Sequence, residues 1–448
     1  MQKIYFGTDG IRGNADKFPF TDETIFKLGK AIAKWSIQKY KTSSPRLLIG
    51  HDTRISCSRI KQFLEDGLHS QGAKITDAGV IPTPAVLQLI QSFDQPLSKD
   101  FNFGIVISAS HNPYTDNGIK ILDAKTGKLS HNDEEIIVKY FNELSSEKEQ
   151  TKHYSLTTWQ NAIQTYEQNI LEHFKPNFLK GLTIVLDCAH GATYKIAPEI
   201  FKKLGANVIT FSNNPDGKNI NYKCGALHPE LIQQEIVNNN ADIGFAFDGD
   251  GDRVIAANKN SILKDGDDLL AILLSHPSYQ NETHIVGTVM TNHGINKYLE
   301  TKNVKLERTK VGDKYVCSAL KKNNWVLGGE TSGHIIIRTY LNTGDGIFIA
   351  LKTIEAMVLT NNIKMETFEK YPQILLNIPV TQKHPLDQEP YKSIIKNQEK
   401  KLENGRIVTR YSGTENLLRI MVEDCQNHSA NNIAQELAQS LQNALCNA

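Results

Sequence analysis

Short aliphatic runs alternate with amphipathic segments along most of this chain, and this alternation restricts its fold more than any other feature. The run Gly104–Ile107 is apolar throughout, which is typical of a strand that is buried on both faces. In residues 21–35, Ile25, Leu28 and Ile32 recur at helical spacing after a threonine and two acidic residues that can begin a helix. Such an alternation of strands and helices predicts a mostly parallel sheet with helices on both faces.

The strand–helix order begins again twice, and the C-terminal part of the chain has a different pattern. The strand Thr183–Leu186 precedes a helix near residues 197–204, and a third series begins with the helix Asp267–Leu274. The C-terminal part combines two strand-like stretches with one helix that is apolar on one face. Interruptions of the pattern near residues 145–157, 258–264 and 370–377 divide the chain. We therefore predict three α/β units and one α+β unit, with the bounds 1–157, 158–258, 259–370 and 371–448.

Charge balance and the lack of long apolar segments exclude several classes of protein. Lys and Arg number 50 against 49 Asp and Glu, whereas a dedicated nucleic-acid binder has a basic excess. The longest aliphatic run, Leu269–Leu274, is far shorter than the about 20 residues that cross a bilayer. The N-terminus lacks the apolar region of a signal peptide, and the six cysteines form no CxxC pair. We therefore expect a soluble, cytoplasmic protein with no nucleic-acid or membrane partner.

The most specific chemical motif is the acidic stretch DGDGDR, which follows a buried strand-like run. Asp248, Asp250 and Asp252 alternate with glycines, so the backbone can curl and bring three carboxylates to one hard cation. An EF-hand loop would need glycine in place of Arg253 and glutamate in place of Lys259. A magnesium site with room for a phosphate oxygen is the better interpretation, and a solvated acidic turn is the alternative.

Ser110 is the candidate nucleophile, because the sequence SASHNP directly follows the strand Gly104–Ile107. Open α/β sheets bind ligands at the carboxyl ends of their strands, so Ser110 can be exposed there with His111 beside it as a proton carrier. The G-x-S-x-G motif of serine hydrolases is absent. An ordinary Ser/Asn/Pro turn is an equal alternative for these residues taken alone.

Three more loops combine glycines with groups that bind phosphate or sugar. Arg410–Glu415 places small hydroxyl residues around a glycine, with Arg419 nearby, and such a loop can cradle a phosphate. Gly328–His334 presents a carboxylate and hydroxyls that can hold vicinal sugar hydroxyls, and Gly7–Gly13 offers one arginine. Polar surface turns are the alternative in each case.

The motifs of nucleotide binding are missing from this set. The sequence has neither a G-x4-GK[ST] phosphate loop nor a G-x-G-x-x-G stretch after a strand. A serine, a divalent-cation site and separate phosphate cradles remain. This combination fits phosphoryl transfer between hydroxyls of similar energy.

Together these motifs resemble those of the α-D-phosphohexomutase superfamily, and most of all its bacterial phosphoglucosamine mutase branch. The resemblance covers nearly the whole chain, in an order and spacing that chance would not produce. The motifs are GTDGIRG (7–13), GIVISASHNPYTDNGIK (104–120), DCAHGA (187–192), GKNINYKCGALH (217–228), DGDGDR (248–253), TVMTN (288–292), VGDKYV (311–316), GGETSGH (328–334), TGDG (343–346) and RYSGTENLLRIMVE (410–423).

The resemblance implies an α/β protein of three related α/β domains with mixed sheets and a C-terminal α+β phosphate-binding domain around a central cleft. It implies that Ser110 carries a phosphoryl group, and that Mg²⁺ is held by the three aspartates and one phosphoserine oxygen. The further residues it implies are Arg12, His111 and Lys120 as assistants of transfer, Glu330, Ser332 and Arg253 as sugar ligands, and Arg410, Ser412, Gly413, Thr414 and Arg419 as the clamp on the non-reacting phosphate.

The activity implied by the resemblance is the interconversion of glucosamine 6-phosphate and glucosamine 1-phosphate, in the route to UDP-N-acetylglucosamine. A sugar 1,6-bisphosphate is the intermediate and the activator, small sugar phosphates are the partners, and a homodimer is compatible with the family. A phosphomannomutase/phosphoglucomutase is the alternative enzyme, and a catalytically silent sugar-phosphate-binding protein is an alternative of another class. The chain departs from the family pattern at Asn416, at Cys57 and at Ala226-Leu227, and the last departure bears on the choice of sugar.

Overall fold

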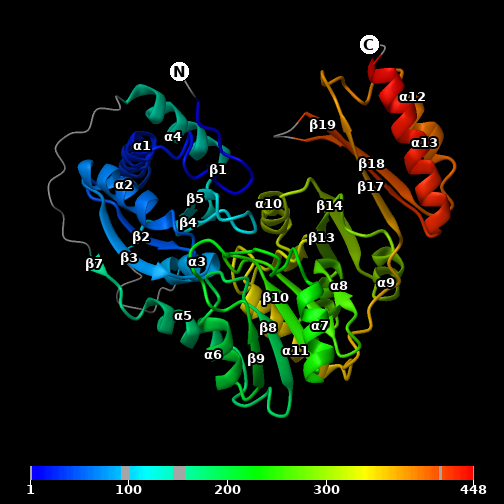
Figure 1. Ribbon diagram of the computed structural model, residues 1–448, viewed down its shortest axis with the longest axis horizontal. Helices are drawn as coiled ribbons and strands as arrows, with labels where there is room; N and C mark the ends of the chain where they lie inside the picture. Colours follow the sequence, from blue (N-terminus) through cyan, green and yellow to red (C-terminus); the bar gives the residue numbers. More distant parts are fainter. Residues whose placement is uncertain (1–2, 92–100, 145–156, 413–415, 447–448) are drawn as a thin grey trace. The chain divides into compact units, whose positions relative to one another are not determined.

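The computed structural model describes residues 3–91, 101–144, 157–412 and 416–446, and the chain forms two compact units (Figure 1). The first unit contains Met1–Glu282 and Lys310–Glu366, and the second contains Thr283–Thr309 and Thr367–Ala448. Each unit has hydrophobic cores of its own. The predicted boundary at residues 145–157 lies almost wholly outside the described residues.

The first sheet of the first unit is mixed, which corrects the mostly parallel sheet expected from the strand–helix alternation alone. Its strand order is β1-β5-β4-β2-β3-β7, with β6 paired to β5. Strand β2 is parallel to β3 and β4, whereas β5 is antiparallel to β1 and β4. The strands are β1 (Ile11–Asn14), β2 (Arg46–His51), β3 (Lys74–Val80), β4 (Phe103–Ile107), β5 (Asp116–Asp123), β6 (Gly127–Lys128) and β7 (Thr157–Thr158).

Helices cover both faces of this sheet, as the sequence predicted. Ile49 and Ile105 lie in one core with the apolar residues of helices α1, α2 and α4. On the other face, Gly104 lies so close to α3 that a Cβ atom there would come within 2.7 Å of the Val86 side chain. Because side chains alternate in direction along a strand, neighbouring residues of a buried strand serve opposite faces. The helices are α1 (Asp22–Tyr40), α2 (Cys57–Ser70), α3 (Thr83–Gln91) and α4 (His131–Glu143).

The second sheet of the first unit has the order β12-β11-β10-β8-β9. Strand β10 is parallel to β8 and antiparallel to β11, so the chain reverses direction at the acidic stretch between β10 and β11. The segment 258–264, predicted as a boundary, forms the turn between β11 and β12. The elements here are α5 (Ala162–Leu171), β8 (Thr183–Asp187), α6 (Ile196–Lys203), β9 (Asn207–Phe211), α7 (Glu230–Asn239), β10 (Ile243–Phe247), β11 (Val254–Asn258) and β12 (Leu263–Lys264).

The rest of the first unit carries the glycine-rich stretch GGETSGH in the turn of an antiparallel hairpin, β15–β16. Helix α8 begins with a capping box between Asp265 and Asp268, which satisfies the first N–H groups of the helix. Helix α11 begins at the predicted TGDG motif, where the Asp345 carboxylate accepts a hydrogen bond from Phe348 N. The elements are α8 (Gly266–Leu274), the 3₁₀ helix η2 (Pro277–Tyr279), α10 (Asp313–Asn323), β15 (Leu327–Gly329), β16 (Ile335–Ile337) and α11 (Gly346–Leu359).

The second unit contains the predicted C-terminal α+β domain, with three antiparallel strands in the order β17-β19-β18. Strand β17 begins within the segment near residues 370–377, where the sequence predicted a boundary but no strand. It was missed because Asn377 and Pro379 are unfavourable in strands and interrupt the pattern. The elements of this unit are β13 (His284–Thr288), α9 (Ile295–Thr301), β14 (Lys305–Thr309), β17 (Gln373–Pro379), α12 (Tyr391–Glu399), β18 (Arg406–Tyr411), β19 (Leu417–Glu423) and α13 (Asn427–Cys446).

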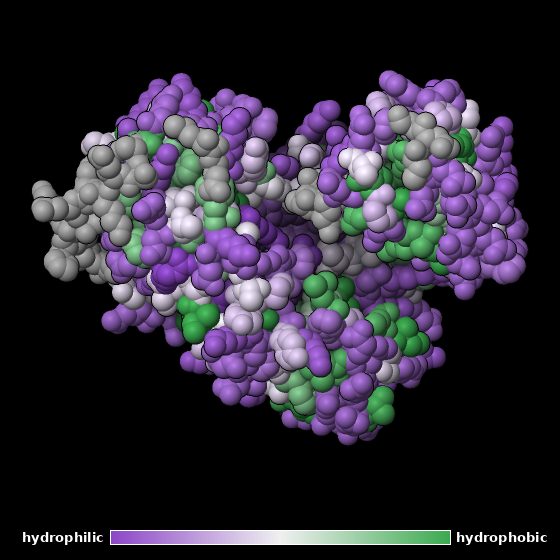
Figure 2. Space-filling view, turned by 45° about the horizontal axis from the view of Figure 1, so that its top comes forward, coloured by the Kyte–Doolittle hydropathy of each residue, from purple (hydrophilic) through white to green (hydrophobic). Residues whose placement is uncertain are grey.

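Polar residues cover most of the molecular face in Figure 2, and the apolar residues on that face form separate patches. Most large aliphatic and aromatic side chains of the described residues lie in the cores instead. Among the helices that the structure describes, none is long and apolar enough to cross a membrane.

Candidate active site

Ser110 lies in the loop between β4 and β5, residues 108–115, which we call the Ser110 loop. Its φ is 53°, in the left-handed region where a residue other than glycine is strained. Its Oγ atom donates a hydrogen bond to Oδ2 of Asp248 over 2.6 Å, and both side chains are buried. The serine of the first sheet and the acidic stretch of the second sheet therefore meet.

The acidic stretch forms a tight loop between β10 and β11, residues 248–253, which we call the acidic loop. One carboxylate oxygen from each of Asp248, Asp250 and Asp252 lies within 4.8 Å of the others. Gly249 has no room for a side chain, because a Cβ atom there would lie 2.6 Å from Ser110 O. Gly251 has a φ of 72°. The two glycines thus allow the close approach and the turn that bring the carboxylates together.

Three buried carboxylates this close together fit a bound cation. Burial raises the pKa of Asp248 well above its usual value, and repulsion from Asp252 and Asp250 raises it further. The Oδ1 atoms of Asp250 and Asp252 are buried and accept no hydrogen bond from the described residues. Carboxylate oxygens are the ligands that hard divalent cations prefer. The donor set therefore fits a metal cofactor.

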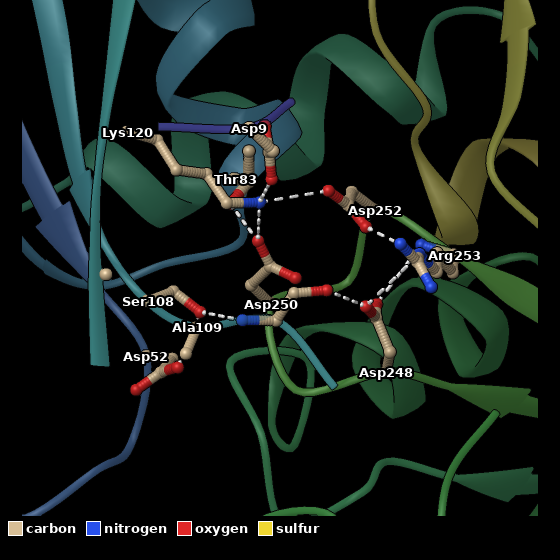
Figure 3. Close-up of polar contacts among 12 residues, drawn as sticks. Asp9, Asp52, Thr83, Ser108, Ala109, Lys120, Asp248, Asp250, Asp252 and Arg253 are labelled. Atoms are coloured by element: carbon tan, nitrogen blue, oxygen red, sulfur yellow. Dashed lines mark hydrogen bonds and ion pairs between the residues drawn. The ribbon is translucent and has the colours of Figure 1, made fainter. Parts of the chain in front are cut away.

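Lys120 joins the acidic loop to β5 of the first sheet, as Figure 3 shows. Its Nζ atom lies 2.6 Å from Oδ2 of Asp250 and 3.1 Å from Oδ2 of Asp252. The same atom lies 2.6 Å from Oδ2 of Asp9. Burial alone would lower the pKa of this ammonium group, but the three carboxylates raise it above its usual value. Lys120 therefore stays charged and neutralises part of the acidic loop.

Two arginines border the same cluster of charges. Arg12 extends from β1, and its Nη2 atom lies 2.8 Å from Oδ2 of Asp9. The Nε atom of Arg253 lies 4.0 Å from Oδ2 of Asp248 and 3.8 Å from Oδ1 of Asp252. Both guanidinium groups are partly exposed. They can therefore meet a ligand from solvent while the carboxylates orient them.

His111 contacts the candidate nucleophile directly, with Nδ1 3.3 Å from Ser110 Oγ. Burial lowers the pKa of His111 to about 3, and the positive charges of Arg253 and Arg12 contribute to the decrease. The imidazole is therefore neutral near pH 7. A group of this low basicity carries a proton poorly. Because Ser110 Oγ donates its hydrogen to Asp248, a hydrogen bond between Ser110 Oγ and His111 requires Nδ1 of the histidine to be the donor.

Glu330 and Ser332 lie in the turn between β15 and β16, in the same unit as Ser110. Oε1 of Glu330 accepts a hydrogen bond from Gly312 N over 2.8 Å. His334, at the end of the turn, places Nδ1 3.6 Å from Oδ1 of Asp252 and so connects the turn to the acidic loop. Among the described residues, no hydrogen bond joins Glu330 or Ser332 to Ser110.

The predicted phosphate clamp lies in the second unit. Arg410 and Arg419 are direct neighbours on β18 and β19, and Arg419 Nη2 lies 3.4 Å from Ser412 Oγ. Burial lowers the pKa of Arg410, and repulsion from Arg419 lowers it further. The two arginines line a cavity of about 410 Å³. Gly413 and Thr414 lie outside the described residues.

Several residues of the site were missed by sequence reasoning. Asp9 belongs to the motif GTDGIRG, in which only the arginine was considered, and Thr83 Oγ1 donates a hydrogen bond to Asp250. Asp52 directly follows β2 and accepts a hydrogen bond from Ser108 Oγ over 2.6 Å. The rule that ligands bind at the carboxyl ends of parallel strands could have identified Asp52.

The first unit thus combines a buried hydroxyl, a set of oxygen ligands for a cation, and several fixed positive charges. Phosphoryl transfer depends on positioning and on the neutralisation of charge on the moving group. The arrangement is suited to that chemistry.

Models of the phosphoglucomutase/phosphomannomutase family match nearly the whole chain. The α/β/α domain I matches residues 3–148, domain II matches residues 163–261, and domain III matches residues 265–373. The C-terminal domain of the same family matches residues 375–440.

Relatives and solved structures agree with these matches. A phosphoglucosamine mutase from Marinomonas sp. is 40% identical over 449 residues, covering 98% of this chain and 97% of the relative. A phosphoglucomutase/phosphomannomutase family protein from Burkholderia thailandensis has a TM-score of 0.78 at 21% identity, covering 99% of this chain and 97% of the other. An Aspergillus fumigatus N-acetylphosphoglucosamine mutase, solved with GlcNAc-6P and magnesium, has a TM-score of 0.68 at 16% identity, covering 99% and 96%. The chain therefore belongs to the phosphoglucosamine mutase family of phosphohexomutases, and it is a mutase, that is, an isomerase.

Proposed function

We propose that this mutase interconverts glucosamine 6-phosphate and glucosamine 1-phosphate by way of a phosphorylated Ser110. The observation that carries the proposal is the 2.6 Å contact between Ser110 Oγ and Asp248 Oδ2, within a cluster of three buried carboxylates. The choice of sugar is supported by the phosphoglucosamine mutase relative at 40% identity over nearly the whole chain. The reaction would serve the route to UDP-N-acetylglucosamine.

The proposed cycle consists of two phosphoryl transfers. First, the bond from phosphorus to Ser110 Oγ breaks, a bond from phosphorus to the free sugar hydroxyl oxygen forms, and the proton of that hydroxyl ends on Ser110 Oγ. The resulting 1,6-bisphosphate turns over and returns its other phosphoryl group to Ser110. The same bisphosphate can phosphorylate an enzyme that has lost its phosphate, so it acts as an activator.

Arg12, His111 and Lys120 assist the transfer from their places around Ser110. Lys120 and Arg12 are held by carboxylates at 2.6 Å and 2.8 Å from their nitrogen atoms. Positive groups fixed in advance need little rearrangement when negative charge develops in the transition state. His111, 3.3 Å from Ser110 Oγ, offers one hydrogen bond to the reacting oxygen.

Asp248, Asp250 and Asp252, with one oxygen of phosphorylated Ser110, would hold Mg²⁺. When bound, the cation neutralises charge on the transferred phosphoryl group. Oδ1 of Asp250 and Oδ1 of Asp252 accept no hydrogen bond from the described residues, so they are available as ligands. Lys120 contacts the Oδ2 atoms of the same two side chains and holds both carboxylates in place.

The sugar and its second phosphate are assigned to the other loops. Glu330, Ser332 and Arg253 bind the sugar hydroxyls. The clamp on the non-reacting phosphate consists of Arg410, Ser412, Gly413, Thr414 and Arg419. We also propose that the chain is divided into four domains, with the bounds 1–157, 158–258, 259–370 and 371–448. A homodimer stays a prediction.

A comparison of kcat/KM for the 1-phosphates of glucosamine, glucose and mannose, at equal metal and bisphosphate, tests the proposal. Glu330 has an exposed fraction of only 8%, but an ion pair with the ammonium group of glucosamine that keeps some contact with solvent is worth only about 1 kcal/mol, which is less than about tenfold. We therefore expect a clear preference for the glucosamine phosphate with measurable activity on glucose phosphate. A higher kcat/KM for glucose or mannose phosphate would leave the family intact and overturn the choice of sugar. Rates without Mg²⁺ that equal those with it would overturn the metal assignment, and no turnover with any sugar would favour a silent binder.

A further inference from the structure

Arg54 is a fully buried arginine beneath the Ser110 loop, and none of the sequence motifs assigned it a role. We propose that Arg54 and Asn221 are positioning residues that together form a carbonyl clamp on the Ser110 loop and hold Ser110 in its reactive geometry. The catalytic part of this inference rests on the proposed phosphoryl transfer through Ser110. The geometric part stands on the contacts below.

The guanidinium group of Arg54 uses all of its hydrogen-bond donors on this loop and its support. Nε donates to Oδ2 of Asp52 over 2.8 Å. Nη2 donates to the carbonyl oxygens of Ser110 and Asn112, each over 2.8 Å. Nη1 donates to the carbonyl oxygens of Pro113 and, over 3.1 Å, Asp116. A guanidinium group has five N–H donors in a fixed plane, and each has an acceptor here.

Asn221 reaches the same loop from the second sheet of the first unit. Its Nδ2 atom donates to Ser110 O over 2.8 Å and to Asn112 O over 3.1 Å. These are two of the carbonyls that Arg54 also binds, so each of them accepts two hydrogen bonds. A carbonyl oxygen has two lone pairs, and both are therefore used.

This saturation opposes any rotation of the Ser110 backbone. Ser110 has a strained φ of 53°, and relaxation to a negative φ would move its carbonyl away from Arg54 and Asn221. The N–H group of Ser110 is fixed as well, because it donates to Ser108 Oγ over 2.9 Å. The Ser110 hydroxyl is thus kept 2.6 Å from Asp248.

The clamp acts through geometry more than through charge. Arg54 is paired with Asp52, and both side chains have an exposed fraction of 0%. Asp52 also accepts the hydrogen bond of Ser108 Oγ, so one carboxylate supports both parts of the loop. The neutralised pair contributes little net charge at the phosphoryl group, and its effect is the placement of backbone atoms.

Arg54→Lys tests the clamp, because lysine keeps the charge opposite Asp52 but offers only three N–H donors on a flexible stem. We expect kcat to fall on the order of 100-fold, with KM for the sugar phosphate within about threefold of wild type, as for a misplaced reacting group. Amide hydrogen exchange should become faster in a peptide covering residues 108–116.

Arg59→Lys is the matched control. Arg59 lies on α2 and also donates to backbone carbonyls, those of Ala15 and Phe20. It forms no hydrogen bond with the Ser110 loop among the described residues. Arg59→Lys should leave kcat and the exchange of residues 108–116 unchanged.

Asn221→Gly tests the second half of the clamp, because glycine keeps the φ of 57° accessible and removes only the amide group. A smaller decrease in kcat is expected, roughly tenfold, since Arg54 still binds both carbonyls. Asn219→Gly is its control, because the Asn219 amide donates to Asn214 O instead.

Normal kcat in Arg54→Lys, or unchanged exchange at residues 108–116, would overturn the clamp. Faster exchange spread equally over the whole first sheet would also overturn it, because that result indicates general destabilisation. A wild-type protein without mutase activity would overturn the proposed function instead, and the exchange experiment would still decide on the clamp.

Discussion

Positive charge is held in opposite ways by Lys120, near Ser110 in the first unit, and by the pair Arg410 and Arg419 in the second unit. Lys120 has an exposed fraction of 2% and contacts three carboxylates at 2.6–3.1 Å. Arg410 forms no ion pair with any residue that the structure describes, and it faces a second arginine across β18 and β19. A lysine surrounded by carboxylates is oriented before any ligand arrives, whereas two neighbouring arginines gain most when an anion binds between them.

The two arrangements suit two different tasks of one reaction, the transfer of a phosphoryl group and the binding of the other phosphate. The first unit is organised in advance for the step that makes and breaks bonds. The second unit offers a cavity lined by two arginines, where we propose that the phosphate that does not react binds. Variants at Ser110, Lys120 and the acidic loop should therefore change mainly kcat, and variants at Arg410 and Arg419 should change mainly binding.

Removal of the nucleophile has the largest expected effect. Ser110→Ala should lower kcat by at least about 10⁴-fold, as in other enzymes that lose their nucleophile. The fold should persist, because one hydroxyl group contributes little to packing. Steady-state rates and circular dichroism of the purified variant check both statements. A folded Ser110→Ala protein with wild-type kcat would exclude a phosphoserine route.

Loss of a metal ligand should have the next largest effect. Loss of an outer-shell partner of a metal site already costs roughly 10- to 100-fold, so Asp250→Asn should lower kcat by at least about 100-fold. Chelation should stop the wild-type enzyme, and added Mg²⁺ should restore it. The measurement is the rate as a function of free Mg²⁺ for both proteins. Full activity in excess chelator would show that the acidic loop has no catalytic cation.

Removal of either clamp arginine should weaken binding with less effect on the chemical step. Arg410→Ala or Arg419→Ala should cost about 1.5–3 kcal/mol, the range for hydrogen bonds to charged groups, which is roughly tenfold to 150-fold in kcat/KM. The loss should be similar for 1- and 6-phosphates, because both ends of the sugar must visit the clamp. Initial rates in both directions measure it. Impairment in one direction only, beyond what the reaction equilibrium requires, would contradict the clamp.

The smallest expected effect is on stability alone, and it concerns Glu65. This buried carboxyl group forms no ion pair with the described residues, unlike the carboxylates around Lys120. Burial raises the pKa of Glu65 from 4.5 to about 7; Lys61 opposes this increase and Asp77 adds to it. The Oε1 atom of Glu65 accepts no hydrogen bond from the described residues. Because the folded-state pKa is the higher one, stability falls as pH rises from 4.5 to about 7 and then stays low.

Glu65→Gln should therefore stabilise the protein above pH 7, by at most about 3 kcal/mol, and should have no such effect below pH 4.5. Urea unfolding at both ends of this range measures the difference, with the exposed Glu143→Gln as control. An equal gain at low and high pH would show that titration of Glu65 is not the cause.

The candidate site could be proposed from the sequence because its side chains follow buried strands. Ser110 and the acidic loop each come shortly after an apolar run, and glycines mark the turn of the acidic loop. Arg54 escaped prediction because its partners are mainly backbone carbonyls of a loop more than 50 residues away, and carbonyls have no signature in sequence. Asn221 lies in the motif GKNINYKCGALH, for which no catalytic role was predicted.

The fold was predictable to a similar degree. The long apolar strands, helix α1 and the capped helix α8 are recognisable from spacing, whereas the antiparallel pairing of β5 with β4 depends on contacts across the sheet. Strand β17 was not predicted because packing against β19, and not its own composition, makes it a strand.

The most direct test of the central claim is to locate the phosphate on the protein during turnover. Wild-type protein is incubated with a labelled sugar 1,6-bisphosphate, quenched, digested and mapped by peptide mass spectrometry, with Ser110→Ala as control. We expect a single labelled site at Ser110, which loses its label when unlabelled glucosamine 6-phosphate is added in excess. A label on another residue of the active protein, or a Ser110 phosphate that persists through turnover, would contradict it.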